Sequence, residues 1–216
     1  MRLKFRSIFP IATLSTLLFC SPAFATVGGP EHIEVLGFDH AEQKIYLLRH
    51  YHDQYGRLPQ LYYYQLTGET PTKLIEVKSI YQKLKRQNQQ QYENAVAKAV
   101  DQIKQRLSPL DELDTRQATI FVIDQHVEHG NLWQHTDPND AFEVVRYTQD
   151  YQIRNTQFLS DLQTSTSYQN NQMKTVQLYS LTNNRYQLAV IEYLGIPFES
   201  GYNKQDAVLL KFDPEN

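Results

Sequence analysis

The sequence predicts an α+β fold, in which a largely antiparallel β-sheet of about seven to nine strands packs against one long amphipathic helix at residues 80–107. Three observations predict this class. Short runs of β-branched and aromatic residues recur between turn sequences, one long segment has helical periodicity, and 216 residues suffice for a domain whose core needs no disulfide or metal. Hydrophobic residues at 41% and charged residues at 21% are typical of globular chains.

Strand-like runs come first along the chain. Residues 44–52 (KIYLLRHYH) and 59–66 (PQLYYYQL) are rich in residue types that favour strands, and the runs at 33–38 and 73–78 are shorter. Polar turn sequences separate these runs, among them TGETP at 67–71. Strands at this spacing, joined by short turns, predict an antiparallel meander.

One long helix follows the first strands. Ser79 and Gln82 have the spacing of a capping box, and Pro109 disfavours helix in the residue before it. From Tyr92 onward, apolar residues recur at the spacing of one helical face. These residues are Ala95, Val96, Ala99, Val100, Ile103 and Leu107. The polar stretch at 86–91 is assigned to a solvated part of the same helix.

Strands return after the helix. The run at 118–127 (ATIFVIDQHV) is predicted to be the most buried strand, because apolar residues occupy all four positions from 120 to 123. Residues 142–154 alternate and predict a long strand, whereas 155–162 predict one helical turn and 163–172 a polar, mobile stretch. The remaining predicted strands are a hairpin at 174–181 and 185–194 and a last strand at 206–212.

The first 25 residues have the pattern of a secretory signal. Three basic residues precede position 7, an apolar run covers 8–20, and Ala-Phe-Ala at 23–25 matches the small-x-small rule for cleavage. The apolar run is shorter than the roughly 20 residues of a membrane span. Lipidation at Cys20 is an alternative that the bulky Phe19 before it disfavours. We therefore expect a signal peptide at 1–25 and one globular domain at 26–216.

Cleavage after Ala25 would change the chemistry of the chain. It would leave 191 residues, remove three basic and no acidic residues, and so shift the formal net charge from −3 to −6. It would also remove Cys20, the only cysteine, which excludes disulfides and thiol chemistry from the mature chain. An acidic protein does not attract nucleic acid or anionic lipid. The periplasm, or secretion from the cell, is the expected location, with no membrane span after cleavage.

Histidines suggest a metal-binding alternative. His50 and His52 share one face of a predicted strand, and His126 and Glu128 share one face of another, together with Asp124. If the two strands were neighbours, His50, His52, His126 and Glu128 would form a nitrogen and oxygen site for Zn²⁺ or Cu²⁺. The competing interpretation is that these are surface or hydrogen-bonded histidines, since the H-x-H pattern is not specific. No other cofactor is predicted.

Catalytic motifs are missing from the sequence. Asp124, His126 and Glu128 would suit acid–base chemistry, but no serine lies in a G-x-S-x-G turn. Neither a Walker A loop nor a G-x-G-x-x-G segment occurs. The sequence therefore favours a protein that is not an enzyme.

Tyrosines are the most unusual feature of the composition. All fifteen lie after residue 25. Tyr62 and Tyr64 share one face of a predicted strand, and Tyr51 lies at the end of the strand before it. Tyrosine combines a large apolar ring with a hydroxyl group, so these three residues are candidate ligand contacts on a binding face. The alternative is that tyrosine simply suits half-buried strands.

These observations lead to a functional expectation. We expect an exported protein without enzymatic chemistry that binds a protein or glycan partner in the cell envelope. A periplasmic metal-binding protein or metallohydrolase is the first alternative. A periplasmic inhibitor or immunity protein is the second, in which the acidic chain would match a basic partner.

Overall fold

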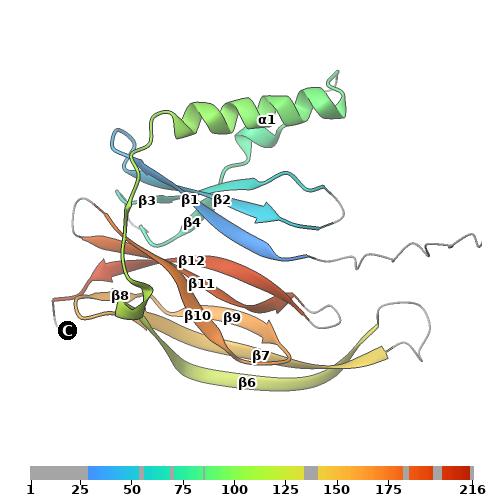
Figure 1. Cartoon of the computed structure of the whole chain (residues 1–216), viewed down its shortest axis with the longest axis vertical. Coiled ribbons are helices and arrows are strands. Elements are labelled where there is room, and N and C mark those ends of the chain that lie inside the picture. Colours follow the sequence, from blue (N-terminus) through green and yellow to red (C-terminus); the bar gives the residue numbers. More distant parts are fainter. Residues whose placement is uncertain are drawn as a thin grey trace, which may run out of the picture.

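A computed structural model gives the fold of the chain (Figure 1). It describes residues 29–53, 56–68, 71–84, 86–133, 141–181, 185–196 and 201–214. Within these ranges the chain forms twelve strands, one α-helix and two 3₁₀ turns, so the fold is α+β but dominated by antiparallel sheet. The predicted signal peptide at 1–25 lies outside the described residues.

Four strands form the first sheet in the order β1-β2-β3-β4, and every pair is antiparallel. They are β1 (Glu31–Asp39), β2 (Lys44–Tyr51), β3 (Gln60–Gln65) and β4 (Leu74–Glu76). All four correspond to strands that the sequence predicts, with ends shifted by one or two residues. The predicted meander is therefore confirmed for this part of the chain.

Eight strands form the second sheet, in the order β5-β10-β11-β12-β8-β7-β6, and β9 pairs with β7 beside this path. They are β5 (Asp111–Glu112), β6 (Thr119–Trp133), β7 (Ala141–Arg154), β8 (Phe158–Ser160), β9 (Gln163–Tyr168), β10 (Met173–Ser180), β11 (Tyr186–Ile196) and β12 (Tyr202–Phe212). The short β8 joins β12 to β7, and buried residues of β7 pack against those of β10–β12. The sheet therefore folds back on itself.

The prediction of a single sheet with a helix at 80–107 needs correction. Helix α1 covers only Gln89–Lys104, and Ser79–Tyr81 form a separate 3₁₀ turn. Asn88 begins the helix because its side chain accepts a hydrogen bond from the Gln91 backbone N–H, while the Gln91 side chain bonds back to Asn88. No helix among the described residues has the length and apolar character needed to cross a membrane.

The segment after β7 also differs from the prediction. Residues 155–162, predicted to form a helical turn, contain β8, and residues 163–172, predicted to be mobile, contain β9. Ser165 and Ser167 are buried on β9, which pairs with β7 from Arg146 to Tyr151. Serine and threonine at alternate positions therefore build a polar strand where composition alone suggests disorder.

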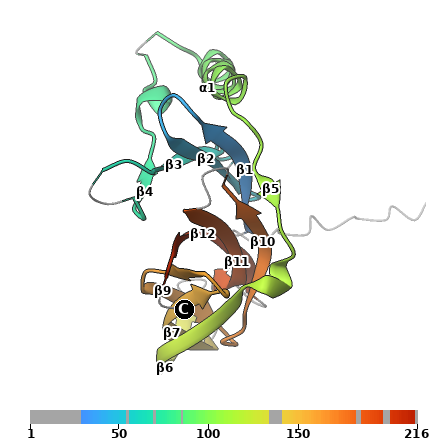
Figure 2. The ribbon, with the colours of Figure 1, turned by 90° about the vertical axis from the view of Figure 1, so that its left-hand side faces the viewer.

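The elements stack in layers, visible from two directions in Figures 1 and 2. Helix α1 lies on the outer face of the first sheet, the inner face of that sheet covers β10–β12, and β7 and β6 lie beyond them. Each boundary is filled by a hydrophobic cluster. Members with almost no exposed surface include Ile45, Leu47, Leu61, Leu188, Leu209 and Leu210.

Candidate functional site

A polar seam joins the two sheets at one edge of β12. Strand β8 pairs only with the last three residues of β12, so in the described part of the chain no strand pairs with the earlier carbonyl groups of β12 on that side. The buried Arg49 donates to the carbonyl of Gln205 at 2.9 Å and pairs with Glu31 at 3.0 Å and Asp206 at 2.7 Å. Side chains of the first sheet therefore satisfy the open edge of the second, which is a structural role.

The predicted tyrosine contacts belong to the same region. Tyr64 is only 3% exposed, and its hydroxyl donates to the carbonyl of Ala207 at 2.8 Å. Tyr51 and Tyr62 are half-buried and hydrogen-bonded to each other. Burial raises the pKa of Tyr51 most, and this hydrogen bond raises it further. The guanidinium of Arg57 lies 4.0 Å from the Tyr51 ring centre. The structure thus places the three tyrosines on the inner face of the first sheet, with Tyr64 in the core.

Three histidines stack on the opposite, outer face of the first sheet. His32 on β1 lies directly across from His50 on β2, and their rings are 4.5 Å apart and nearly parallel. His52 follows just after β2, with its ring 4.7 Å from that of His32. The His52 Nε2 and the His32 Nδ1 are 2.7 Å apart. The sequence predicts that His50 and His52 share a face, but not that His32 lies beside both.

A carboxylate and a lysine extend the histidine stack. Glu34 contacts the Nε2 of His50 at 2.8 Å and the Nζ of Lys104 at 2.8 Å. Partial burial raises the pKa of Glu34, but the bonds from Lys104 and His50 outweigh it and leave the pKa lowered. The pKa of His32 is lowered by burial and by the two neighbouring imidazoles. Both effects favour an ionised Glu34 beside a neutral His32 near neutral pH.

The other half of the predicted metal set lies elsewhere. His126 and Glu128 are on β6, where their side chains are 3.7 Å apart and Glu128 also pairs with Arg146. Strands β10–β12 separate β6 from the first sheet (Figures 1 and 2). The structure therefore does not bring His126 and Glu128 together with His50 and His52. In the described part of the chain, no three His, Cys, Asp or Glu side chains are arranged as a metal site.

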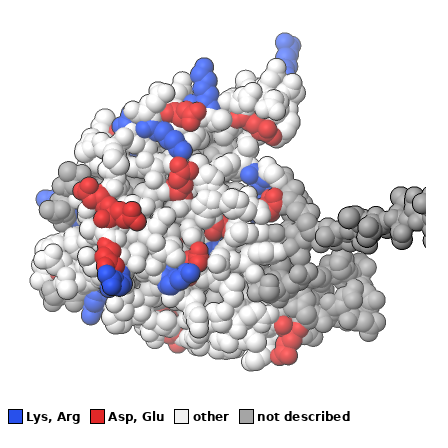
Figure 3. Space-filling view, viewed as in Figure 1, with Lys and Arg blue, Asp and Glu red and all other residues white. Residues whose placement is uncertain are grey.

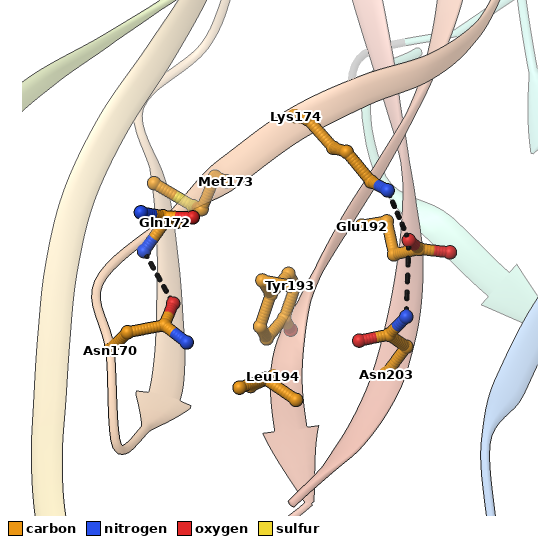
Figure 4. Close-up of a pocket in the computed structure, with 8 residues that line it drawn as sticks. All are labelled: Asn170, Gln172, Met173, Lys174, Glu192, Tyr193, Leu194 and Asn203. Atoms are coloured by element: carbon orange, nitrogen blue, oxygen red, sulfur yellow. Dashed lines mark hydrogen bonds and ion pairs between the residues drawn. The ribbon is translucent and has the colours of Figure 1, made fainter.

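An open groove of about 480 Å³ lies at the ends of β10, β11 and β12 (Figure 4). Its lining residues are Asn170, Gln172, Met173, Lys174, Glu192, Tyr193, Leu194 and Asn203. Glu192 accepts from Lys174 at 2.9 Å and from Asn203 at 3.2 Å. Burial raises the pKa of Glu192, but bonds from Lys174 and Gln205 leave it lowered. No sequence motif marks this groove, because its residues come from three strands and a loop.

Strand β6 contradicts the prediction that 118–127 is the most buried strand. It ends the second sheet, and only β7 pairs with it among the described residues. The exposed fractions are 46% for Phe121, 47% for Val122, 58% for Ile123 and 39% for Val127. The apolar run predicted burial on both faces, but only Ile120 reaches the core, where it packs against the buried residues of β7 and β10–β12.

Strand β6 has only part of the usual protection of an edge strand, namely the charged Asp124 and Glu128 and one bulge. Residues 119–133 contain no lysine, arginine or proline, the residues that commonly prevent pairing at sheet edges. A bulge between Val122 and Asp124 is the one irregularity in its pairing with β7. Charged side chains gather over α1 and the first sheet in Figure 3, whereas the lower part of that view carries few. Sequence reasoning found this strand but missed its exposure.

No family model matches the chain, and neither a curated protein nor a solved structure matches it. The geometry of the chain itself therefore carries the functional argument. Three surfaces stand out: the histidine stack, the groove and the free edge of β6.

Proposed function

We propose that this chain is an exported, non-enzymatic protein that binds a partner protein in the cell envelope, and that a strand of the partner adds to β6. One observation carries the proposal: a fifteen-residue edge strand exposes Phe121, Val122 and Ile123 beside a backbone edge with which no other strand of the described residues pairs. Exposed apolar edges pair readily with another chain, and strand addition is a common mode of protein recognition.

The free edge offers two kinds of contact to an added strand. Backbone N–H and C=O groups supply affinity, and side chains on both faces of β6 supply selectivity. Val122 and Val127 lie opposite Tyr151 and Tyr147 of β7, on the face toward the core, whereas Phe121 lies opposite Gln152. Completing the burial of one half-exposed aliphatic side chain would contribute about 1 kcal/mol.

Charge on the hairpin indicates what the partner strand carries. Asp124 lies directly opposite Asp150, and like charges in such cross-strand pairs destabilise a sheet. Asp150 accepts a hydrogen bond from the Thr164 hydroxyl at 2.6 Å, which does not neutralise the pair. A lysine or arginine on the added strand would do so. The partner strand is therefore apolar with a basic residue, which also fits the inhibitor or immunity version of this function.

Photo-cross-linking in the cells that make the protein tests this proposal. A photoreactive residue replaces His126, whose side chain is 71% exposed on β6, and, as the control, the exposed Lys98 on α1. We expect one protein adduct that forms from position 126 and not from position 98. Absence of an adduct at 126, or the same adducts at both positions, would contradict the proposal.

A glycan is the second candidate partner, and the groove in Figure 4 favours it. Amide side chains, a carboxylate and apolar side chains surround the groove, a combination that suits a sugar carrying hydroxyl and acetamido groups. Saturation-transfer NMR with tri-N-acetylglucosamine is the test. The expected signal is lost in Asn203→Ala and kept in Asn171→Ala, since Asn171 instead donates to Gln125. No transfer to the native chain removes this candidate.

A further inference from the structure

We propose that His32, His50 and His52 form a pH-sensitive latch, which holds the start of β1 against the end of β2 near neutral pH and releases it in acid. This proposal is independent of the binding function assigned to β6. It rests on the packing of the three imidazoles, on a close contact between two of their nitrogens, and on backbone contacts at the same end of the two strands.

The three rings form one stack with His32 in the middle. His32 and His50 are cross-strand partners, and their rings lie 4.5 Å apart and nearly parallel. The ring of His52 lies 4.7 Å from that of His32 and is tilted by only 13° against it. Each outer ring therefore packs against the middle one, so a positive charge on one ring acts on its neighbour at close range.

The contact between His32 and His52 has room for one proton but not for two. The Nδ1 of His32 and the Nε2 of His52 are 2.7 Å apart, so one nitrogen carries a proton and the other presents a lone pair. When only one of the two rings is cationic, its proton fills this contact. When both rings are cationic, two N–H donors point at each other, and the contact is lost.

The surroundings of the stack oppose a charge on the middle ring. Glu34 of β1 contacts the Nε2 of His50 at 2.8 Å and is itself bonded to Lys104 of α1 at 2.8 Å. Burial lowers the pKa of His32, the two neighbouring rings lower it further, and the more distant Glu34 only partly offsets them. A histidine whose pKa is lowered by folding stabilises the fold above its ordinary pKa and loses this contribution as the pH falls. We therefore expect the latch to hold above about pH 6.5 and to release below it.

Other charged groups at this end face the inner side of the sheet. Arg57 lies 4.0 Å from the ring centre of Tyr51 and pairs with Glu31 and Asp53. Because neighbouring residues of a strand point to opposite faces, these charges lie across the sheet from the stack. In the described part of the chain, the charged groups on the side of the stack are therefore the carboxylate of β1 and the lysine of α1.

Backbone contacts at the same end tie the stack to the start of β1. The N–H of His52 donates to the carbonyl of Pro30 at 3.0 Å. Gly29 lies so close to His52 that a Cβ at Gly29 would be 1.8 Å from the His52 carbonyl oxygen. Like charges directly opposite each other destabilise a strand pair, and strand ends open at the lowest free energy. A cationic His32 opposite a cationic His50 would therefore open this end of the sheet first.

Opening this end would also weaken the polar seam between the sheets. Glu31, the residue before His32, pairs with Arg49 at 3.0 Å. The N–H of Ile33, the residue after it, donates to the side-chain Oε1 of Gln205 on β12 at 2.9 Å. The start of β1 thus contacts both the end of β2 and the second sheet. Release of the latch would therefore loosen the joint between the two sheets.

Amide hydrogen exchange, followed residue by residue by NMR in the purified chain, tests the latch. The reporters are the N–H groups of His52 and Ile33, whose hydrogen bonds are described above. After correction for the intrinsic pH dependence of exchange, we expect their protection to fall by about tenfold or more between about pH 7.5 and about pH 5. The N–H of Val77, which donates to the carbonyl of Leu61 elsewhere in the first sheet, should change by less than about twofold.

Two variants separate the latch from a general response to acid. His32→Phe keeps a ring between His50 and His52 but cannot take a proton, so the fall in protection at the two reporters should shrink to less than about twofold. His126→Phe removes an exposed histidine on β6 and should respond to acid like the native chain. Circular dichroism establishes that each variant folds, and His32→Gln gives the same test if His32→Phe does not fold.

Three results would overturn the proposal. The first is protection of the His52 and Ile33 N–H groups that does not change with pH. The second is an equal loss of protection at Val77, which would mean that acid acts on the whole sheet. The third is a His32→Phe variant whose reporters respond to acid as they do in the native chain.

Discussion

Similar apolar residues are buried between the two sheets but exposed on strand β6 of the β6–β7 hairpin. Between the sheets, Ile45 and Leu188 have no exposed surface, because the inner face of β1–β3 covers β10–β12. On β6, Ile123 is 58% exposed although it stands in an equally apolar run. The difference shows that an apolar run does not determine its own burial. The layer that packs against it does, and most of β6 has no such layer.

The largest effect that would test this contrast is on stability. Leu188→Ala should lower the free energy of unfolding by about 2–5 kcal/mol, because it leaves a cavity between two layers. Ile123→Ala should change it by only about 0.5 kcal/mol, as for other surface positions. Urea unfolding followed by circular dichroism measures both. Equal losses would mean that β6 is buried in the folded chain.

The polar seam should be the next most sensitive feature. Arg49→Met should cost about 2–3 kcal/mol, because it leaves Glu31 and Asp206 without their shared cation at the sheet boundary. Lys204→Met is the matched control, since Lys204 lies 3.8 Å from Asp206 and is more exposed. It should cost less than about 1 kcal/mol. The same unfolding assay applies, and comparable losses would show that the seam does not join the sheets.

High pH should unfold the chain, because its buried tyrosines must then ionise. Burial raises the pKa of Tyr64 and of Tyr193, and raises that of Tyr81 to about 12. Tyrosine in the unfolded chain ionises near pH 10, so the stability from these groups is complete below pH 10 and is lost as pH rises toward 12 and beyond.

Tyrosinate absorbance and circular dichroism, recorded together against pH, check that prediction. Part of the tyrosinate signal should appear only as the chain unfolds. Ionisation of all fifteen tyrosines near pH 10 with the folded spectrum intact would contradict the placement of Tyr64 in the core.

The smallest effect concerns the helix. Asn88→Ala should lower the free energy of unfolding by about 1 kcal/mol, because it removes the side-chain acceptor of the Gln91 N–H. Ser79→Ala, at the capping position predicted from the sequence, should have a smaller effect, since the structure places Ser79 in a 3₁₀ turn. Thermal unfolding compares the two variants. A larger loss for Ser79→Ala would favour the longer helix at 80–107.

Local patterns predicted the elements whose neighbours along the chain are also their neighbours in space. Strands β1 to β4 follow one another in the sequence and in the sheet, so turns and alternation sufficed to find them. The return of β8 and β9 to β7 was missed, because pairing with β7 gives polar residues such as Ser165 and Ser167 their burial. Because these buried residues are polar, the sequence of β9 has no apolar pattern that would predict a strand.

The candidate sites depend on register, which the sequence does not state. Alternation placed His50 and His52 on one face, but His32 lies opposite His50 only because a bulge between Val35 and Gly37 shifts, by one residue, the register that begins at the turn after β1. Gln43 in that turn has a φ of 53°, a conformation that is uncommon for residues other than glycine and that the sequence therefore does not predict. The wrong prediction for β6 has the same origin, since exposure follows from its place at the end of the sheet.

The amount of complex formed through β6 tests the central claim most directly. The photoreactive residue at position 126 is combined with Ile123→Lys, and separately with Leu162→Lys, a control whose side chain is similarly exposed at 56% but lies outside β6. We predict that the cross-linked adduct disappears with Ile123→Lys and persists with Leu162→Lys, at equal levels of folded protein. An adduct that survives Ile123→Lys unchanged would contradict strand addition at β6.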